Sequence, residues 1–498
     1  MRRRIYAVMV CFMAGILLMG CGKKEETPIR VALTDDIVSL DIAGTKDTMS
    51  ETVGRCVFST LYTFDENMEL QPCLAEGEER VSELEWLFHL RKDAVFQDGT
   101  PVKASDVVFS LNRAMSIELA EKSLLIIDRV EAPDDYTVKV ITKEPDANLK
   151  SMFVRVSTSV MSEKAMGSPD YDFDHPVGSG PYKVVERKAG ESILLERFDD
   201  YFQGPADNQY LEFVIDPSEQ NRTASLLNNT IDVTVRISTA DSDYLKLEED
   251  VRVYEHSSTK MELFSLNPDS GPFEHVKVRQ AVFCAIDRQK LVDNVARGYG
   301  SILNSMVPPP VPGAIEFDGF AYNPELSKKL LEESGYGDGF SFTVISFDEL
   351  RKQMLEYIKL DLAQVGIRMD YEFYELDEYL KIIEEDRHMA TIMSWTSNPD
   401  PDSTFSQLFS KTGHVTTNHS KFSDGRVEEL LRRGKEEEDS IARGKIYEEA
   451  NEIVAESYCV LPLYQPSVVI AAGDDIEGIR LNSQGIFGYE SMRRVKEK

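Results

Sequence analysis

The chain has 498 residues, a formal charge of −32 and 42% hydrophobic residues. Because single hydrophobic cores stop growing near ~250–300 residues, this length predicts two to four domains. The hydrophobic content excludes an intrinsically disordered chain. The strong negative charge argues against a nucleic-acid partner, since a polyanion repels phosphate backbones.

The first twenty residues are predicted to form a lipoprotein signal peptide. The basic start MRRR precedes fifteen mostly apolar residues, a run too short for a membrane span and typical of a signal-peptide core. It ends in LLMGC, which resembles the lipobox of bacterial lipoproteins, so Cys21 is predicted to carry the lipid and residues 21–29 to form the lipidated tether. Two or three acyl chains would then hold the protein on the extracytoplasmic face of the cell membrane, the periplasmic side if the cell has an outer membrane. The alternative is a signal peptide with an incidental cysteine.

Four further cysteines follow the signal peptide: Cys56, Cys73, Cys284 and Cys459. None forms a CxxC pair, which argues against a zinc site. Cys284 lies in the apolar run AVFCAI and is predicted to be a buried thiol. A Cys56–Cys73 disulfide could form outside the cell, and the sequence leaves this open.

The first predicted elements are a strand over residues 29–36 and a helix running into a turn over residues 50–64. Further on, Trp86, Phe88 and Leu90 recur with period two, which predicts one buried face of a strand. The turn QDGTP follows, and then a helix for which Ser105 or Asp106 is the expected N-cap.

The glycine-rich stretch GSGPY precedes two predicted strands. Its glycines do not form a phosphate-binding loop, because no helix follows and no Lys-Ser/Thr closes the motif. Gly178 and Gly180 are instead expected to permit a chain crossing between domains.

The second half of the chain alternates helices with strands. Residues 276–300 predict a pair of helices, of which the second begins at Asp287. Helices over residues 323–336 and 350–367 each end in glycine and precede a strand, which indicates an α/β architecture. A long helical stretch then leads into an apolar strand over residues 458–472.

Four motifs in this order resemble the extracytoplasmic solute-binding proteins of the peptide/nickel (family 5) group of ABC importers: FHLRKDAVFQDGTPVKASDVVFSL, PVGSGPYKVVERKAGESILLER, GPFEHVKVRQAVFCAIDRQKLV and CVLPLY. The resemblance covers about residues 30–490. It implies a two-lobed α/β fold of the type II periplasmic-binding-protein kind, with an additional α+β domain inserted in the first lobe. The implied division is domain I at residues 30–58, 178–262 and 470–498, domain II at 59–177 and domain III at 263–469.

The stretch SWTSNPDPDSTF carries the candidate ligand site. In peptide binders of this family an aspartate at the start of a DPD-like motif pairs with the ligand's α-ammonium, and Asp400 stands at that place here. Proline on either side restricts the backbone and limits the entropy lost on binding. Trp395 offers a flat face for the ligand, with core packing as the alternative, and Asp402 is expected to cap the following segment. A plain surface turn is the alternative for Asp400.

The cation opposite the ligand's carboxylate stays open at this stage. Arg351, Arg387 and Lys411 are candidates by region only. No metal ligand or cofactor is predicted, because the histidines are scattered and only His414 and His419 lie close together.

The function that the resemblance implies is that of a monomeric, lipid-anchored binding protein that delivers short peptides to an ABC permease and its ATPases. A nickel or haem chelate, a sugar or a glutathione-like ligand, or a role as a peptide sensor, are alternatives within the family. An enzyme is not expected. GxSxG, HExxH and Walker A motifs are absent from the sequence, and Asp400 and Asp402 lie too close along one chain to flank a scissile bond.

Overall fold

The computed structural model describes residues 27–495, except residues 46, 118–121, 412 and 414–416. The predicted signal peptide and Cys21 therefore lie outside the described residues. Within the described ranges, none of the helices is long and apolar enough to cross a membrane.

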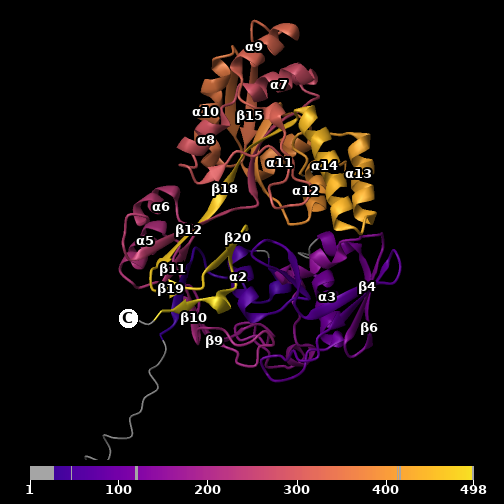
Figure 1. The fold of residues 1–498 in the computed structure, drawn as a ribbon, viewed down its shortest axis with the longest axis vertical. Coiled ribbons are helices and arrows are strands. Elements are labelled where there is room, and N and C mark those ends of the chain that lie inside the picture. Colours follow the sequence, from indigo (N-terminus) through magenta and orange to yellow (C-terminus); the bar gives the residue numbers. More distant parts are fainter. Residues whose placement is uncertain (1–26, 46, 118–121, 412, 414–416, 496–498) are drawn as a thin grey trace, which may run out of the picture.

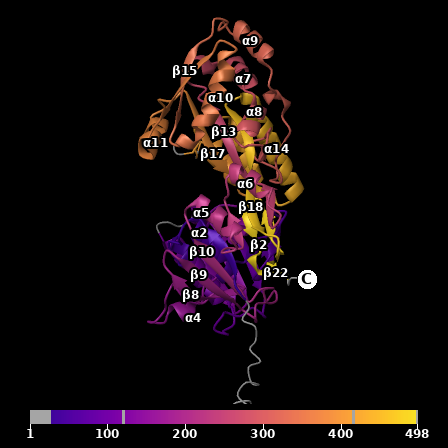
Figure 2. The same ribbon diagram turned by 90° about the vertical axis from the view of Figure 1, so that its left-hand side faces the viewer.

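A mixed sheet of twelve strands runs through the molecule, and β18 (Val460–Gly473) lies near its middle (Figure 1). Residues 460–464 of β18 pair antiparallel with β13 (Lys260–Leu266). Residues 467–473 of the same strand pair antiparallel with β12 (Val251–Ser257). One strand is therefore shared by two halves of the sheet, which lie one above the other along the long axis (Figure 2).

The half above the middle of β18 is called the upper lobe here. Beyond β13 its sheet continues through β17 (Ala390–Thr396), β15 (Ser341–Ser346) and β16 (Arg368–Phe373). A single large hydrophobic core reaches from Met261 to Tyr464. The helices around this sheet are α7 (Val276–Cys284), α8 (Arg288–Asn294), α9 (Pro324–Glu333), α10 (Lys352–Ala363), α11 (Leu376–Glu384), α12 (Pro401–Leu408), α13 (Gly425–Glu436) and α14 (Ser440–Ser457).

The remaining part is called the lower lobe. Its part of the long sheet consists of β11 (Val233–Val235), β1 (Ile29–Leu33), β10 (Tyr210–Ile215), β9 (Ser192–Arg197) and β8 (Tyr182–Lys188). The helices α2 (Thr48–Val57), α5 (Glu219–Leu227) and α6 (Thr239–Leu245) belong to this lobe. The two faces of this sheet bury separate apolar clusters, one around Val31 and Phe213 and one around Ala32 and Leu226.

A second, four-stranded antiparallel sheet belongs to the lower lobe and has its own core. Its strands are β4 (Ala75–Arg80), β5 (Glu85–Leu90), β7 (Thr137–Thr142) and β6 (Ile127–Asp134), and they pack with α3 (Ala104–Ser116). The period-two prediction for β5 is confirmed, because Trp86, Phe88 and Leu90 are all buried in this core.

The prediction that Ser105 or Asp106 is the N-cap of α3 is wrong. Lys103 occupies that position, and the helix begins at Ala104. Asp106 lies in the first turn, where its Oδ2 accepts a hydrogen bond of 2.9 Å from the backbone N–H of Lys103. A carboxylate at this third position reaches back to the cap residue, so the same side chain supports the helix start from inside the helix. The prediction for α8 is confirmed, since Asp287 is its N-cap.

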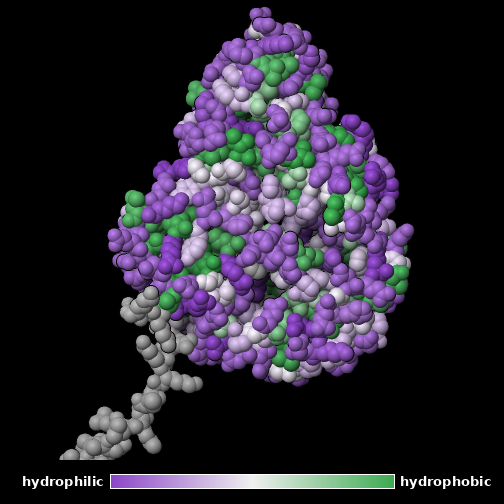
Figure 3. All heavy atoms as spheres, viewed as in Figure 1, coloured by the Kyte–Doolittle hydropathy of each residue, from purple (hydrophilic) through white to green (hydrophobic). Residues whose placement is uncertain are grey.

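Shorter segments complete the fold. The small strands are β2 (Tyr62–Phe64), β3 (Leu70–Pro72), β14 (Gly300–Ser301), β19 (Ile476–Glu477), β20 (Arg480–Asn482), β21 (Gly485–Phe487) and β22 (Arg493–Arg494), and a one-turn helix is α4 (Glu163–Met166). Hydrophilic residues cover most of the face seen in Figure 3.

The four cysteines that follow the signal peptide are all buried free thiols. The open question of a Cys56–Cys73 bridge is thereby resolved, since neither residue has a disulfide partner. Burial raises the pKa of Cys73 and that of Cys284 to about 11. Both thiols are therefore protonated at neutral pH, which makes them poor nucleophiles.

Gly178 and Gly180 let the start of β8 pass against the end of α2. The N–H of Gly180 donates to the carbonyl oxygen of Val57 at 2.9 Å. A Cβ on Gly178 would lie 1.9 Å from that same oxygen, and one on Gly180 would lie 2.6 Å from the Val57 carbonyl carbon. Only residues without a Cβ fit this crossing.

We expect Gly178→Ala to lower the unfolding free energy by about 2–4 kcal/mol, because either Val57 or the crossing strand must shift. Gly77→Ala in β4 is the matched control, since a Cβ there meets nothing within 4 Å. Thermal melting of the three proteins checks this, and equal melting temperatures for both variants would contradict the steric argument.

Candidate functional site

The parallel strands of both lobes end toward the same junction. β11 runs antiparallel to β18, so its carboxyl end points toward the upper lobe, and β1 and β10 run parallel to it. In the upper lobe β17 runs toward the β12–β13 turn, and β15 and β16 run parallel to it. Their carboxyl ends therefore point toward the lower lobe. Ligands of open α/β sheets bind at the carboxyl ends of the strands, so the space between these two edges is the candidate site.

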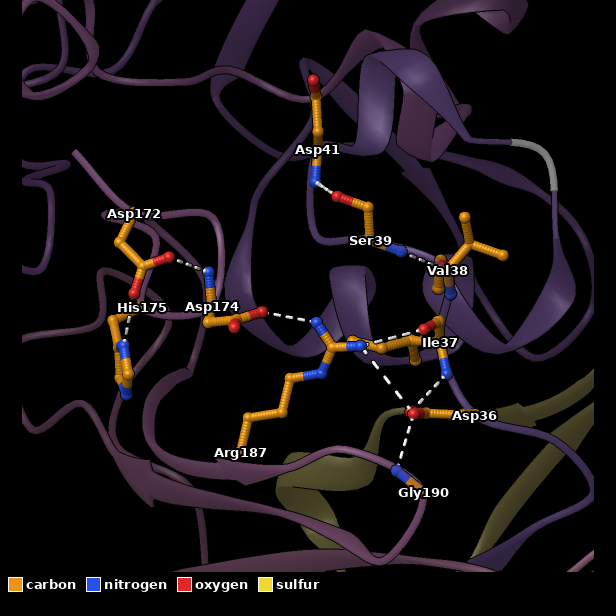
Figure 4. A network of polar contacts seen from close by, with 11 residues as sticks. Asp36, Ile37, Val38, Ser39, Asp41, Asp172, Asp174, His175, Arg187 and Gly190 are labelled. Atoms are coloured by element: carbon orange, nitrogen blue, oxygen red, sulfur yellow. Dashed lines mark hydrogen bonds and ion pairs between the residues drawn. The ribbon is translucent and has the colours of Figure 1, made fainter.

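The loop after β1 is held rigidly on the lower edge of this space. Asp36 accepts hydrogen bonds of 2.8 Å from the backbone N–H of Ile37 and from that of Gly190 (Figure 4). The guanidinium of Arg187 donates to the carbonyl oxygen of Ile37 at 3.1 Å and also pairs with Asp174. With both oxygens engaged, Asp36 positions the loop.

On the upper edge, the loop after β15 contains a buried charge network. Arg351 is 5% exposed and donates to Glu262 at 3.1 Å and to Asp348 at 2.5 Å. Glu262 also pairs with Lys260 at 3.1 Å. The candidate cation Arg351 is thus already bound to two carboxylates of its own lobe.

The other two candidate cations differ from Arg351 in their surroundings. Arg387 is exposed and pairs with Glu385 at 2.7 Å. Lys411 lies past the end of α12, where its backbone N–H donates to Glu428 at 2.7 Å. Neither residue lies at a strand end of the candidate site, so these positions give no support for a role in binding a ligand carboxylate.

Asp400 follows β17 and is the N-cap of α12. Its Oδ1 accepts from the backbone N–H of Asp402 at 2.9 Å and from the guanidinium of Arg443 at 2.8 Å. Its Oδ2 accepts from the side-chain amide of Asn148 in the lower lobe. The expectation that Asp402 caps this segment is wrong: Pro401 occupies the first helical position, which favours the preceding residue as the cap.

Trp395 is half-buried near the end of β17 and packs against the core of the upper lobe. Its indole N–H donates to the hydroxyl of Thr404 at 3.1 Å. This contact fixes the ring against α12, so the structure places Trp395 and Asp400 on the same strand end.

The lobes also touch away from β18, at the base of α13 and α14 (Figure 1). The N–H of Ala147 donates to the carbonyl oxygen of Lys435 at 2.8 Å, and Asn148 donates to Asp400. Arg80 at the end of β4 pairs with Glu438 in the turn between the two helices. The two lobes are therefore connected through β18 and also through this second contact.

Asp146, Asp400 and Asp402 lie around Arg443 at the second contact, where Lys435 also pairs with Asp402 at 3.9 Å. Burial raises the pKa of Asp146 to about 6, with further contributions from the charges of Asp400 and Asp402 across the contact. Burial also raises the pKa of Asp402, whose Oδ1 accepts from the hydroxyl of Tyr447 at 3.0 Å. Burial alone would lower the pKa of Arg443, but Asp400 opposes it strongly, so the pKa of the guanidinium lies above its ordinary value. One buried cation faces several negative charges here.

Two surface depressions lie elsewhere. One of about 550 Å³ runs along α3, and one of about 220 Å³ lies beside α8. Neither is lined by the strand ends described above. Among the described residues there is no group of three or more His, Cys, Asp or Glu side chains that could hold a metal ion.

The raised pKa of Asp146 predicts a pH-dependent stability. Its carboxyl group binds the proton more tightly in the folded chain than in the unfolded chain, so stability is lost as pH rises from about 4 to about 6. Asp146→Asn removes the charge and keeps an oxygen for the N–H of Asn148. We therefore expect this variant to be more stable than the parent by about 3 kcal/mol at pH 8 and about equally stable at pH 4.

Melting temperatures of the two proteins between pH 4 and pH 8 measure this difference. Asp98→Asn is a control, because Asp98 is an exposed turn residue far along the chain from this contact. A constant difference between Asp146→Asn and the parent at every pH would refute the linkage.

Comparison with known proteins gives the family. Residues 69–416 match the family model described as bacterial extracellular solute-binding proteins, family 5 Middle. The chain is 29% identical over 461 residues to the dipeptide-binding protein of Escherichia coli, covering 85% of this chain and 86% of that one. It is 27% identical over 475 residues to heme-binding protein A of Haemophilus influenzae, covering 88% and 86%.

Solved structures agree with this fold. HbpA2 from Haemophilus parasuis superposes with a TM-score of 0.86 at 25% identity, covering 94% of this chain and 100% of that one. The murein tripeptide-binding protein MppA in its unliganded open form also gives 0.86, at 21% identity, covering 95% and 98%. The two-lobed type II fold expected from the sequence is confirmed, and the chain belongs to the bacterial extracellular solute-binding proteins of family 5.

Proposed function

We propose that this chain is the lipid-anchored substrate-binding component of an ABC importer and that it captures short peptides between its two lobes. The observation that carries the proposal is the pair of carboxyl strand edges that face each other beside β18. Relatives named for dipeptide and glutathione binding, and a similar structure solved in complex with Met-Leu, favour a peptide over the other ligands of the family.

The two lobes and the separate four-stranded sheet correspond to three domains in this proposal. Domain I, at residues 30–58, 178–262 and 470–498, carries the lower strand edge, and domain III, at residues 263–469, carries the upper one. Domain II, at residues 59–177, supplies Asn148 and the second contact. Closure moves domain III against the other two domains by bending β18 and the β12–β13 turn. The ligand shifts the equilibrium between the open and closed forms only by the difference between its affinities for them.

Asp400 is the proposed partner of the ligand's ammonium group, and Trp395 the proposed flat surface beside it. Oδ1 of Asp400 stays with Arg443 and the N–H of Asp402, while the ligand's ammonium replaces Asn148 at Oδ2. Exchanging a neutral amide for a cation strengthens the hydrogen bond to the carboxylate. The proline on each side keeps the carboxylate in place.

Native mass spectrometry of the protein after exposure to an enzymatic casein digest tests the capture of peptides. We expect bound masses of short peptides, and their absence after exhaustive washing would refute peptide capture. The same incubation, followed by analysis of the supernatant, tests for hydrolysis: binding without catalysis predicts that the digest keeps its composition.

For a retained peptide, calorimetry of Asp400→Asn should show the affinity falling at least tenfold, since the ammonium loses its charged partner. Asp424→Asn is the matched control, because Asp424 is also a helix N-cap of the upper lobe and also pairs with an arginine. An unchanged affinity in Asp400→Asn would remove Asp400 from the site and leave it a structural cap.

The proposed anchor predicts where the protein is found in cells. With Cys21 intact the protein should sediment with membranes, because two or three acyl chains bind a bilayer stably. Cys21→Ser should move most of it to the soluble extracytoplasmic fraction, and Cys284→Ser should not. A membrane fraction that is the same in all three proteins would refute lipid attachment at Cys21.

A further inference from the structure

One arginine at the lower strand edge has no charged partner among the described residues. Arg236 directly follows β11 and is exposed, at the carboxyl end that points toward the upper lobe. Three further cations near these edges, Arg351, Arg187 and Lys260, each form an ion pair. The chain has a net charge of −32, but the guanidinium of Arg236 forms no ion pair in the described chain and so attracts anions locally.

The backbone at Arg236 is held in an uncommon conformation. Its φ of 51° lies in the left-handed region, which side chains other than glycine, asparagine and aspartate rarely adopt. Such strain persists only where the surroundings fix it, and it concentrates at functional sites. This positive φ could not be predicted from the sequence, because glycine or asparagine would be the expected residue at such a turn.

A buried second arginine fixes this turn. Arg222 of α5 is 3% exposed and donates to the carbonyl oxygen of Asp216 at 2.8 Å and to that of Arg236 at 3.3 Å. Asp216 directly follows β10 and Arg236 directly follows β11, so one guanidinium links the ends of two strands. Because the carbonyl of Arg236 points to Arg222, the turn is set before any ligand arrives.

The carboxylates around this turn have other partners. Asp232 pairs with Arg30 and Arg494, and Asp241 accepts a hydrogen bond of 2.7 Å from the hydroxyl of Thr223. Oδ1 of Asp216 accepts from the N–H of Ser218 at 3.0 Å, and Oε1 of Glu219 accepts from the N–H of Ser238 at 2.6 Å. Both contacts support the same turn. Hydrogen bonds from Arg222 and to Glu219 therefore hold the turn at Arg236, and the Arg236 guanidinium forms no ion pair within the described residues.

We infer that Arg236 binds the anionic end of the ligand, and that Arg222 is the positioning residue that holds it ready. This rests on the proposed capture of a ligand between the lobes. The ligand's ammonium then meets Asp400 in the upper lobe and its carboxylate meets Arg236 in the lower lobe. A zwitterionic ligand bridges the two edges, and both of its charges are satisfied only when the lobes close.

The test compares the free-acid and C-terminal amide forms of one equimolar mixture of synthetic tripeptides, by competition and native mass spectrometry. We expect the parent protein to retain the acid forms at least tenfold over the amides, because a charge-assisted pair to the carboxylate is lost in the amide. Arg236→Gly should reduce this preference to within about twofold. Glycine adopts the positive φ readily, so the variant removes the charge without opposing the turn.

Two further variants separate charge from structure. Arg236→Lys should keep part of the preference for the acid. Arg252→Gln is the matched control, because Arg252 is an exposed arginine of β12 that forms no ion pair within the described residues, and it should retain the full preference.

The outcomes distinguish this inference from the proposal on which it rests. A preference that survives in Arg236→Gly, or a parent protein that retains acids and amides equally, overturns the role of Arg236 and leaves peptide capture standing. A parent protein that retains neither form overturns peptide capture itself.

Discussion

The architecture depends on one strand that belongs to two lobes at once. β18 pairs with β13 in its first half and with β11 and β12 in its second half. One backbone therefore forms strand-pairing hydrogen bonds in both lobes. In the lower lobe β11 runs antiparallel to β18, and in the upper lobe β17 runs antiparallel to β13, which is itself antiparallel to β18. Both β11 and β17 therefore end toward the middle of β18. The position of the candidate site therefore follows from the direction of the strands.

In the proposed closure, the joint is the middle of β18, between the residues that pair with β13 and those that pair with β12, together with the β12–β13 turn. The second contact between the lobes opposes free movement about that joint. It combines a main-chain hydrogen bond at Ala147, the amide of Asn148 on Asp400, and the ion pair of Arg80 with Glu438. Burial raises the pKa values of Asp146 and Asp402 at this contact, and the charge of Asp400 adds to both shifts.

Local signals in the sequence predicted local structure well. The spacing of Trp86, Phe88 and Leu90 predicted a buried strand face, and an aspartate before an apolar helix predicted the cap at Asp287. At α12 two aspartates competed for the cap, and Pro401 between them decides in favour of Asp400. Propensity alone did not separate them.

Contacts between distant residues could not be predicted in this way. Arg351 was a candidate for the ligand's carboxylate by region, but its partner Glu262 comes from another strand far away in sequence. Asn148 and Arg443 reach Asp400 from different lobes, and Arg222 reaches Arg236 from a neighbouring helix. The family resemblance supplied the two-lobed fold and the fold-forming motifs, whereas the charges that face the candidate space became visible only once the strands were placed.

The buried, unpaired thiols have a consequence for how the chain matures. Cys56, Cys73, Cys284 and Cys459 are buried without covalent cross-links, so the conformation of the described chain rests on packing, hydrogen bonds and ion pairs. An exported protein built in this way needs no oxidant or disulfide isomerase to reach its native state.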